Sequence, residues 1–418
     1  MTTDGKGSKL NSAVSSVVDI SEGNEAANFE SAIIATGFGK FNVFLMLVIL
    51  PTAFSQVFES VSMSYVVPVA QCDLNLTLEA KGMLNAITFA GMITSGFLWG
   101  YLCDVTGRKR IMVYGYLLDG FFVLMASSSQ NFSMLLVAKF FGGFIINGPF
   151  SAATSYLSEF HSSQYRARVH LVRGTIVSLG NIVLPLLAWG VLPQNLSFRL
   201  FNVFEYHSWN VFLLICSLAP LTSGVIFIFM PESPKFLMSA GRNEEALEVF
   251  QKIYKFNTGK PIDTYPIKML IKETRESQAS VRYKQNTNTI IRGVLEGLHQ
   301  IKPLFCPPNI LRLVHVCFNT FCIMMSTNTL KLWLPQLFQA INDYKFAHDG
   351  VSSSMCVMIE NLGQKKNESS PCDVNLDNSS VYINSMVVGI TQIMTFGVAG
   401  ILVNMLGKRK LAGMTKIK

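Results

Sequence analysis

Eight runs of apolar residues, separated by short polar turns and one long polar segment, dominate the pattern along the chain. A helix needs about 20 mostly apolar residues to cross a bilayer. The predicted spans are residues 41–69, 82–101, 111–129, 134–157, 171–192, 210–230, 310–333 and 383–405. The first run contains Pro51, so we expect its helix to tilt or break there. The pattern predicts an all-α polytopic membrane protein.

The polar segments divide the chain into five parts: residues 1–38, 39–230, 231–308, 309–405 and 406–418. The first part is rich in Ser, Gly and Asn, which predicts a disordered tail. The second holds six spans and the fourth holds two, with a polar loop at 334–382 between them. In the central segment, NEEALEVFQKIYKF predicts an amphipathic helix capped by Asn243.

Composition agrees with this reading, because only 14% of the 418 residues are charged and 50% are hydrophobic. Soluble domains carry about 25% charged residues. The net charge is +8, and the basic residues behind it lie beside the apolar runs rather than on a basic face with interleaved aromatic residues. It therefore indicates membrane orientation and argues against a nucleic-acid partner. Membrane lipid is the expected surrounding.

No catalytic or metal-binding motif stands out in the sequence. The chain contains no GxxxxGK[ST], GxSxG or HExxH string, and its eight cysteines show neither CxxC nor Cys/His ligand spacing. These absences argue against nucleotide hydrolysis, esterase chemistry and zinc chemistry. We therefore expect no enzyme activity, no cofactor and no metal.

Charge and glycosylation patterns give two independent predictions of orientation. The central segment 231–308 holds 12 Lys/Arg against 8 Asp/Glu, which places it on the cytoplasmic side. With the N-terminus also cytoplasmic, every N-x-[ST] sequon falls on the opposite side: Asn75, Asn131, Asn195, Asn367 and Asn378. Asn131 lies close to the membrane, and Asn367 and Asn378 are the best acceptors. The same loop holds Cys356 and Cys372, a candidate disulfide that spacing alone leaves open.

The segment 100–110, GYLCDVTGRKR, forms a tight basic connection between the second and third spans. Its notable residues are two glycines, an acid and three bases: Gly100, Gly107, Asp104, Arg108, Lys109 and Arg110. Residues 400–410, GILVNMLGKRK, align with it without gaps, and Asn404 stands in the place of Asp104. Such internal repeats are typical of transporters built from two similar halves.

The motif in this context resembles the signature loop of the major facilitator superfamily. Further motifs are similar to those of its sugar and organic-ion branches, most of all synaptic vesicle glycoprotein 2 and its relatives. They are YLSEF at 156–160, EYHSWNVF at 205–212, PESPKFL at 231–237, LWLP at 332–335 and GKRKLAG at 407–413. Members have twelve spans, so the resemblance implies a complete six-helix half followed by two helices of a C-terminally truncated second half.

Three ionisable side chains fall inside predicted spans, where such groups mark functional sites by default. Glu59 shares a helical face with Ser55 and Ser62, Asp119 lies in the third span, and Lys139 opens KFFGGFIING in the fourth. The resemblance implies that Glu59 and Lys139 face one cavity and that protonation of the acid couples to solute movement. The alternative is that Lys139 neutralises an acid only to permit its burial.

The resemblance also implies roles for other residues. Asp104 and Arg108 would brace the cytoplasmic helix ends as a gate. Trp189 and Trp333 are candidates for a substrate cavity, although lipid-belt or core packing is the commoner role of an aromatic residue in a span.

Three functions remain open from the sequence. The first is a carrier for a small organic ion or sugar-like solute, working by alternating access with or without protons. The second is a non-transporting membrane glycoprotein that binds protein partners, and the third is an inactive short form that self-associates or has no transport of its own. The expected location is an intracellular vesicle or the plasma membrane.

Overall fold

The computed structural model describes residues 26–194, 196–200, 204–271, 306–307, 309–347, 354, 356–357 and 379–414. The described part is almost wholly helical, which confirms the predicted fold class. Its longer helices are α4 (Leu50–Val69), α5 (Leu78–Thr106), α6 (Arg108–Ser127), α7 (Phe132–Glu159), α8 (Ser163–Val191), α9 (Ser208–Phe229), α13 (Asn309–Ala347) and α15 (Ser379–Met414). The shorter elements are α2 (Phe29–Ala35), α3 (Lys40–Val48), α10 (Pro234–Ser239), α11 (Asn243–Thr258), a 3-10 turn (Ile262–Thr264), β1 (Ser197–Leu200) and β2 (Phe204–His207).

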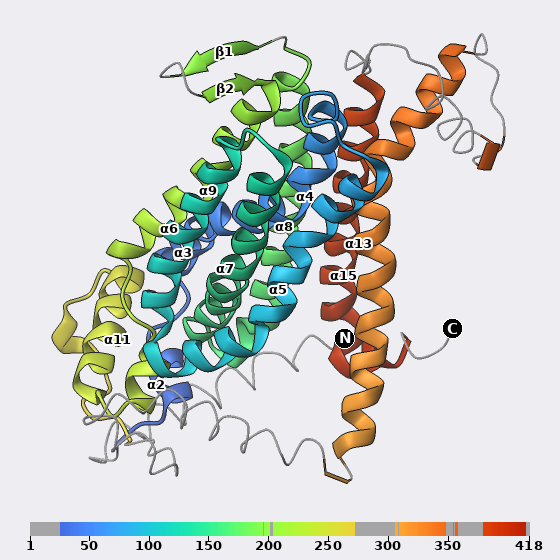
Figure 1. Cartoon of the computed structure of the whole chain (residues 1–418). Coiled ribbons are helices and arrows are strands. Elements are labelled where there is room, and N and C mark those ends of the chain that lie inside the picture. The colour runs from blue at the N-terminus through green and yellow to red at the C-terminus, as the bar shows by residue number, and fades with distance from the viewer. Residues whose placement is uncertain are drawn as a thin grey trace.

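Among the described residues, eight helical segments are long and apolar enough to cross a membrane. Six of them, from α3–α4 to α9, form one bundle, and α13 and α15 lie side by side along one flank (Figure 1). The first span is interrupted as expected, because α3 ends at Val48 and α4 begins at Leu50 with Pro51 in its first turn. Proline is tolerated there because the first helical N–H groups have no intrahelical partner.

The expectation of disorder through residue 38 is wrong for residues 26–38. Asn28 caps α2 by accepting a hydrogen bond from the Ser31 N–H at 2.8 Å. Phe29 and Ile33 are buried, and the Phe29 ring lies 6.0 Å from that of Phe250 on α11. These apolar side chains order the segment because α11 offers them a matching surface.

The amphipathic helix predicted in the central segment is confirmed as α11, but its predicted cap is wrong. It buries Ala246, Val249, Phe250, Ile253 and Tyr254. The Asn243 side chain does not cap the helix and instead donates to the carbonyl oxygens of Leu270 and Ile271. It ties the helix to the following segment rather than closing its first turn.

A β-hairpin stands where the sequence predicted only a turn between the fifth and sixth spans. Strands β1 and β2 pair antiparallel, with Ser197 opposite His207. Figure 1 shows the hairpin at one end of the bundle and α2 and α11 at the other. The exposed Asn75 follows α4 at the hairpin end, where Asp73 accepts a hydrogen bond from Trp209 at 2.8 Å. Asn75 and α11 therefore lie at opposite ends of the bundle, and the assignment of the α11 end to the cytoplasm stays a prediction.

The last two spans are longer than expected. Helix α13 continues to Ala347, into the predicted loop 334–382, and α15 continues to Met414, into the predicted tail. At the second copy of the signature motif, α15 runs straight through Gly407. In the first copy, Gly107 has φ 93° and ends α5. The repeat in sequence is therefore not a repeat in backbone conformation.

Helices α5 and α7 approach closely because both carry glycine at their crossing. A Cβ at Gly91 would meet the backbone of Phe140 and Phe144, and one at Gly143 would meet the backbone of Thr88. Small residues permit such contact between membrane helices, where dispersion forces rather than the hydrophobic effect drive association. This crossing fixes α7, and α7 carries Lys139.

We expect Gly91→Ala to destabilise the protein by about 1–3 kcal/mol, since the added methyl group must push two backbones apart. Thermal unfolding of the purified protein in detergent measures the effect. Gly82→Ala in the same helix is the matched control, because no atom lies within 4 Å of its added Cβ. Equal melting temperatures for the two variants would contradict the close crossing.

Candidate functional site

Glu59 and Lys139 form a buried ion pair at the centre of the six-helix bundle. Lys139 Nζ on α7 lies 2.8 Å from Glu59 Oε2 on α4, and both side chains are 1% exposed. The ammonium also donates to the Glu59 backbone oxygen at 3.3 Å and to Ser62 Oγ at 3.4 Å. The lysine therefore has three acceptors, all of them on α4.

Glycine in KFFGG makes room for this pair. Gly142 lies one turn after Lys139, and a Cβ there would collide with the Glu59 carboxylate. The structure thus brings together the two residues that the sequence paired, and it explains why a small residue follows the lysine. Burial of both partners is compatible with a role in coupling and with a purely structural ion pair.

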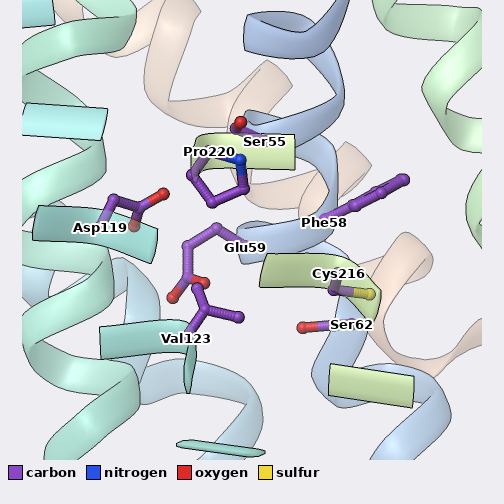
Figure 2. Close-up of a pocket in the computed structure, with 8 residues that line it drawn as sticks. All are labelled: Ser55, Phe58, Glu59, Ser62, Asp119, Val123, Cys216 and Pro220. Atoms are coloured by element: carbon purple, nitrogen blue, oxygen red, sulfur yellow. The ribbon is translucent and has the colours of Figure 1, made fainter. Parts of the chain in front are cut away.

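Asp119 lies beside the pair and completes a cluster of two acids and one base. Its side chain is 1% exposed, and neither carboxylate oxygen has a hydrogen-bond partner among the described residues. Figure 2 shows Asp119 and Glu59 facing one small space between α4, α6 and α9. The lining residues are Ser55, Phe58, Glu59, Ser62, Asp119, Val123, Cys216 and Pro220. The predicted polar strip of Ser55, Glu59 and Ser62 therefore faces this space.

The signature loop forms a second candidate site, at the α11 end of the bundle. Glu232 accepts hydrogen bonds from the N–H groups of Arg108 and Lys109 at 3.1 and 3.0 Å, and so caps α6. A carboxylate there is favoured by the helix dipole. Gly107 makes the approach feasible, since its φ is 93° and a Cβ would lie 2.6 Å from Glu232 Oε2.

Arg108 links three helices at this end. Its guanidinium donates to the Cys103 carbonyl oxygen at 2.9 Å and lies 3.3 Å from Glu159 Oε1 at the end of α7. Ser233 Oγ donates to Glu159 Oε2 at 2.5 Å. Glu159 and Glu232 were not predicted as site residues, although both belong to quoted motifs, YLSEF and PESPKFL. Arg108 thus contacts these two acids, and the part that Asp104 plays in the brace stays a prediction because its side chain lies outside the described residues.

A further contact joins α2 to the start of α8. Glu30 accepts from the Ser163 N–H at 2.6 Å and pairs with Arg166 at 2.8 Å. Partial burial opposes ionisation of Glu30, but the bonds from Ser163 and Arg166 outweigh it and lower the pKa of its carboxyl group. This pair attaches the start of α8 to the N-terminal segment.

The two tryptophans do not line the small central space. Trp189 is 40% exposed near the end of α8, and Trp333 lies on α13. Their proposed part in a substrate cavity stays a prediction. Among the described residues, no atom lies within 4 Å of a Cβ placed at Gly100, and Arg110 is exposed, so their proposed part in the gate also stays a prediction.

The candidate Cys356–Cys372 disulfide is not formed, because Cys356 is an exposed free thiol. Cys72, in the turn after α4, is the disulfide-bonded cysteine, and its partner lies outside the described residues. Cysteine spacing within one loop could not reveal a bond to a distant turn. Cys372, Asn195, Asn367 and Asn378 also lie outside the described residues.

Sequence reasoning overlooked Lys331, an ionisable residue inside the span on α13. Its Nζ donates to Asn181 Oδ1 on α8 at 3.3 Å, and Asn181 Nδ2 donates to Gln392 Oε1 on α15 at 2.9 Å. This polar chain joins the six-helix bundle to the last two spans. The rule that singled out Lys139, a charge within an apolar run, would also have found Lys331.

Comparison with known proteins places this geometry in context. The family model described as Major Facilitator Superfamily matches residues 34–415. Synaptic vesicle glycoprotein 2C of Mus musculus is 29% identical over 271 residues, covering 64% of this chain and 37% of that protein. Synaptic vesicle glycoprotein 2B of Rattus norvegicus is 26% identical over 333 residues, covering 77% and 49%. The chain thus spans less than half the length of these curated relatives.

Solved structures share the fold. The partially occluded inward-open xylose transporter XylE from E. coli aligns with a TM-score of 0.57 at 13% identity, covering 89% of this chain and 75% of that one. A structure titled D-xylose-proton symporter gives 0.52 at 12% identity, covering 87% and 69%.

We expect Glu59→Gln and Lys139→Met to destabilise the protein by about 3–5 kcal/mol each, because each removes one partner of a buried ion pair. The double variant removes both charges and should cost less than the sum of the single changes. Melting temperatures of the three variants in detergent check this. Additive effects would mean that the two side chains do not interact.

Proposed function

Because the chain belongs to the Major Facilitator Superfamily, we propose that it takes part in moving a small organic solute across a membrane by alternating access. The observation that carries this proposal is the buried Glu59–Lys139 pair with Asp119 beside it. Charges are costly inside a membrane domain and are retained there mainly in ion and substrate pathways.

The solute class we propose is an organic ion or a sugar-like molecule. Two observations support it: the similarity to synaptic vesicle glycoproteins 2C and 2B, and the shared fold with a D-xylose-proton symporter. Proton coupling through Glu59 and Lys139 is part of the proposal. A membrane acid that gains and loses a proton changes the charge of its site, and this charge change can favour one conformation over another.

The loop around Arg108 would act as the gate. Its contacts with Glu159 and Glu232 hold the ends of α5, α6, α7 and the segment before α10 together. Breaking these contacts would let the helix ends separate. The polar chain through Lys331 and Asn181 would transmit movement to α13 and α15. We propose a vesicle or plasma membrane location with a cytoplasmic N-terminus.

The test uses the full chain reconstituted into liposomes that contain a pH-sensitive dye. Addition of D-xylose, D-glucose, tetraethylammonium or glutamate should change the internal pH for at least one solute, because coupled entry carries protons. Protein-free liposomes are the control. If no solute in a broad panel produces proton or labelled-solute flux, transport by this chain is excluded and a partner-binding glycoprotein is favoured.

In the same assay, Glu59→Gln should remove the dependence of uptake on external pH while the protein still reaches the membrane. The reason is that Lys139 would lose its ionisable partner on α4. Glu79→Gln is the matched control, since Glu79 is an exposed acid in the first turn of α5. Normal pH dependence in Glu59→Gln would remove Glu59 from the coupling mechanism.

A further inference from the structure

The central cluster contains one more acid than it has bases. Lys139 is engaged with Glu59 and Ser62, all on the α4 side of the space. Asp119, on α6, is equally buried and has no hydrogen-bond donor among the described residues. An ionised carboxylate in such a place would be a buried charge without a partner, which proteins avoid by neutralising the group.

Among the described residues, the surroundings of Asp119 offer no other base. Glu59 from α4 and Lys139 from α7 are the charged groups that act on it electrostatically. Cys216 faces the space from α9, and Tyr116 lies one turn earlier on α6. Helix α5 contributes no titratable side chain to the described lining. One base therefore serves two acids, and two like charges at a shared site disfavour each other.

We propose that Asp119 binds one exchangeable proton in the closed bundle, while Glu59 stays ionised against Lys139. The bound proton forms an O–H bond on the Asp119 carboxylate and makes the cluster electrically neutral. When the bundle opens, water reaches Asp119 and accepts that proton. A role of this proton in transport rests on the proposed function, whereas the binding of the proton by Asp119 does not.

The geometry favours a proton over a metal cation. A metal cation needs several oxygen ligands around it. The space between Asp119, Glu59 and Ser62 is too narrow for a water molecule, and Ser55 donates its hydroxyl hydrogen to the Pro51 carbonyl oxygen. A proton needs no such room.

Infrared spectroscopy of the purified protein tests this directly, because a protonated buried carboxyl group has a C=O band that ionised carboxylates lack. The wild-type protein should show the band at neutral pH, and Asp119→Asn should lose it. Glu59→Gln should lose it as well, because Asp119 then becomes the only acid beside Lys139 and pairs with it ionised. Lys139→Gln should increase the band about twofold, since both acids then need protons.

Glu159→Gln is the matched control. Glu159 is also a buried acid on α7, but Arg108 and Ser233 satisfy its carboxylate, so the band should remain. Persistence of the band in folded Asp119→Asn would overturn the proposal, as would its persistence in Glu59→Gln. A wild-type band that appears only when Na⁺ is replaced by choline would overturn it in favour of a metal cation. These outcomes do not depend on transport, so they separate this inference from the proposed function.

Discussion

The pairing of Glu59 with Lys139 inside an apolar bundle is the constraint around which the six-helix unit is built. Neither charge is tolerable alone at 1% exposure, so α4 and α7 must be held in one register. The neighbouring features serve that register. Gly142 leaves room for the carboxylate, and the Gly91 and Gly143 contacts set the distance between α5 and α7.

Polar and charged contacts close both ends of the bundle. At the α11 end, Arg108 and the carboxylates of Glu159 and Glu232 satisfy helix termini with charge-assisted hydrogen bonds. At the hairpin end, the Asp73 carboxylate accepts a hydrogen bond from Trp209 at 2.8 Å, and Tyr206 bonds with Ser128 at 2.7 Å. Such contacts at a helix end can break when water enters. This arrangement suits a molecule whose ends separate.

Local sequence signals identified much of the candidate site. An ionisable residue inside an apolar run is visible without a structure, so Glu59, Asp119 and Lys139 could all be named. The glycine before the basic triplet predicted the turn at Gly107. This residue has a φ of 93°, a backbone conformation that favours glycine, and it joins α5 to α6. The signals failed where a partner was remote. Asn243 binds carbonyl groups 27 and 28 residues away, and the disulfide at Cys72 involves no cysteine of its own turn.

The sequence by itself determined that the chain crosses a membrane, which parts of it form the eight spans, and which charges enter the bilayer. Those properties follow from the composition and the hydrophobic periodicity of each segment, which do not depend on how the segments pack together. Only the tertiary structure decided how the charges are shared. Lys139 on α7 donates to Glu59 on α4, where Gly142 leaves room for the carboxylate, and not to Asp119 on α6. The pairing of Glu59 with Lys139 depends on their distance in space. These residues are 80 positions apart in the sequence, so they come within bonding distance only when the helices pack.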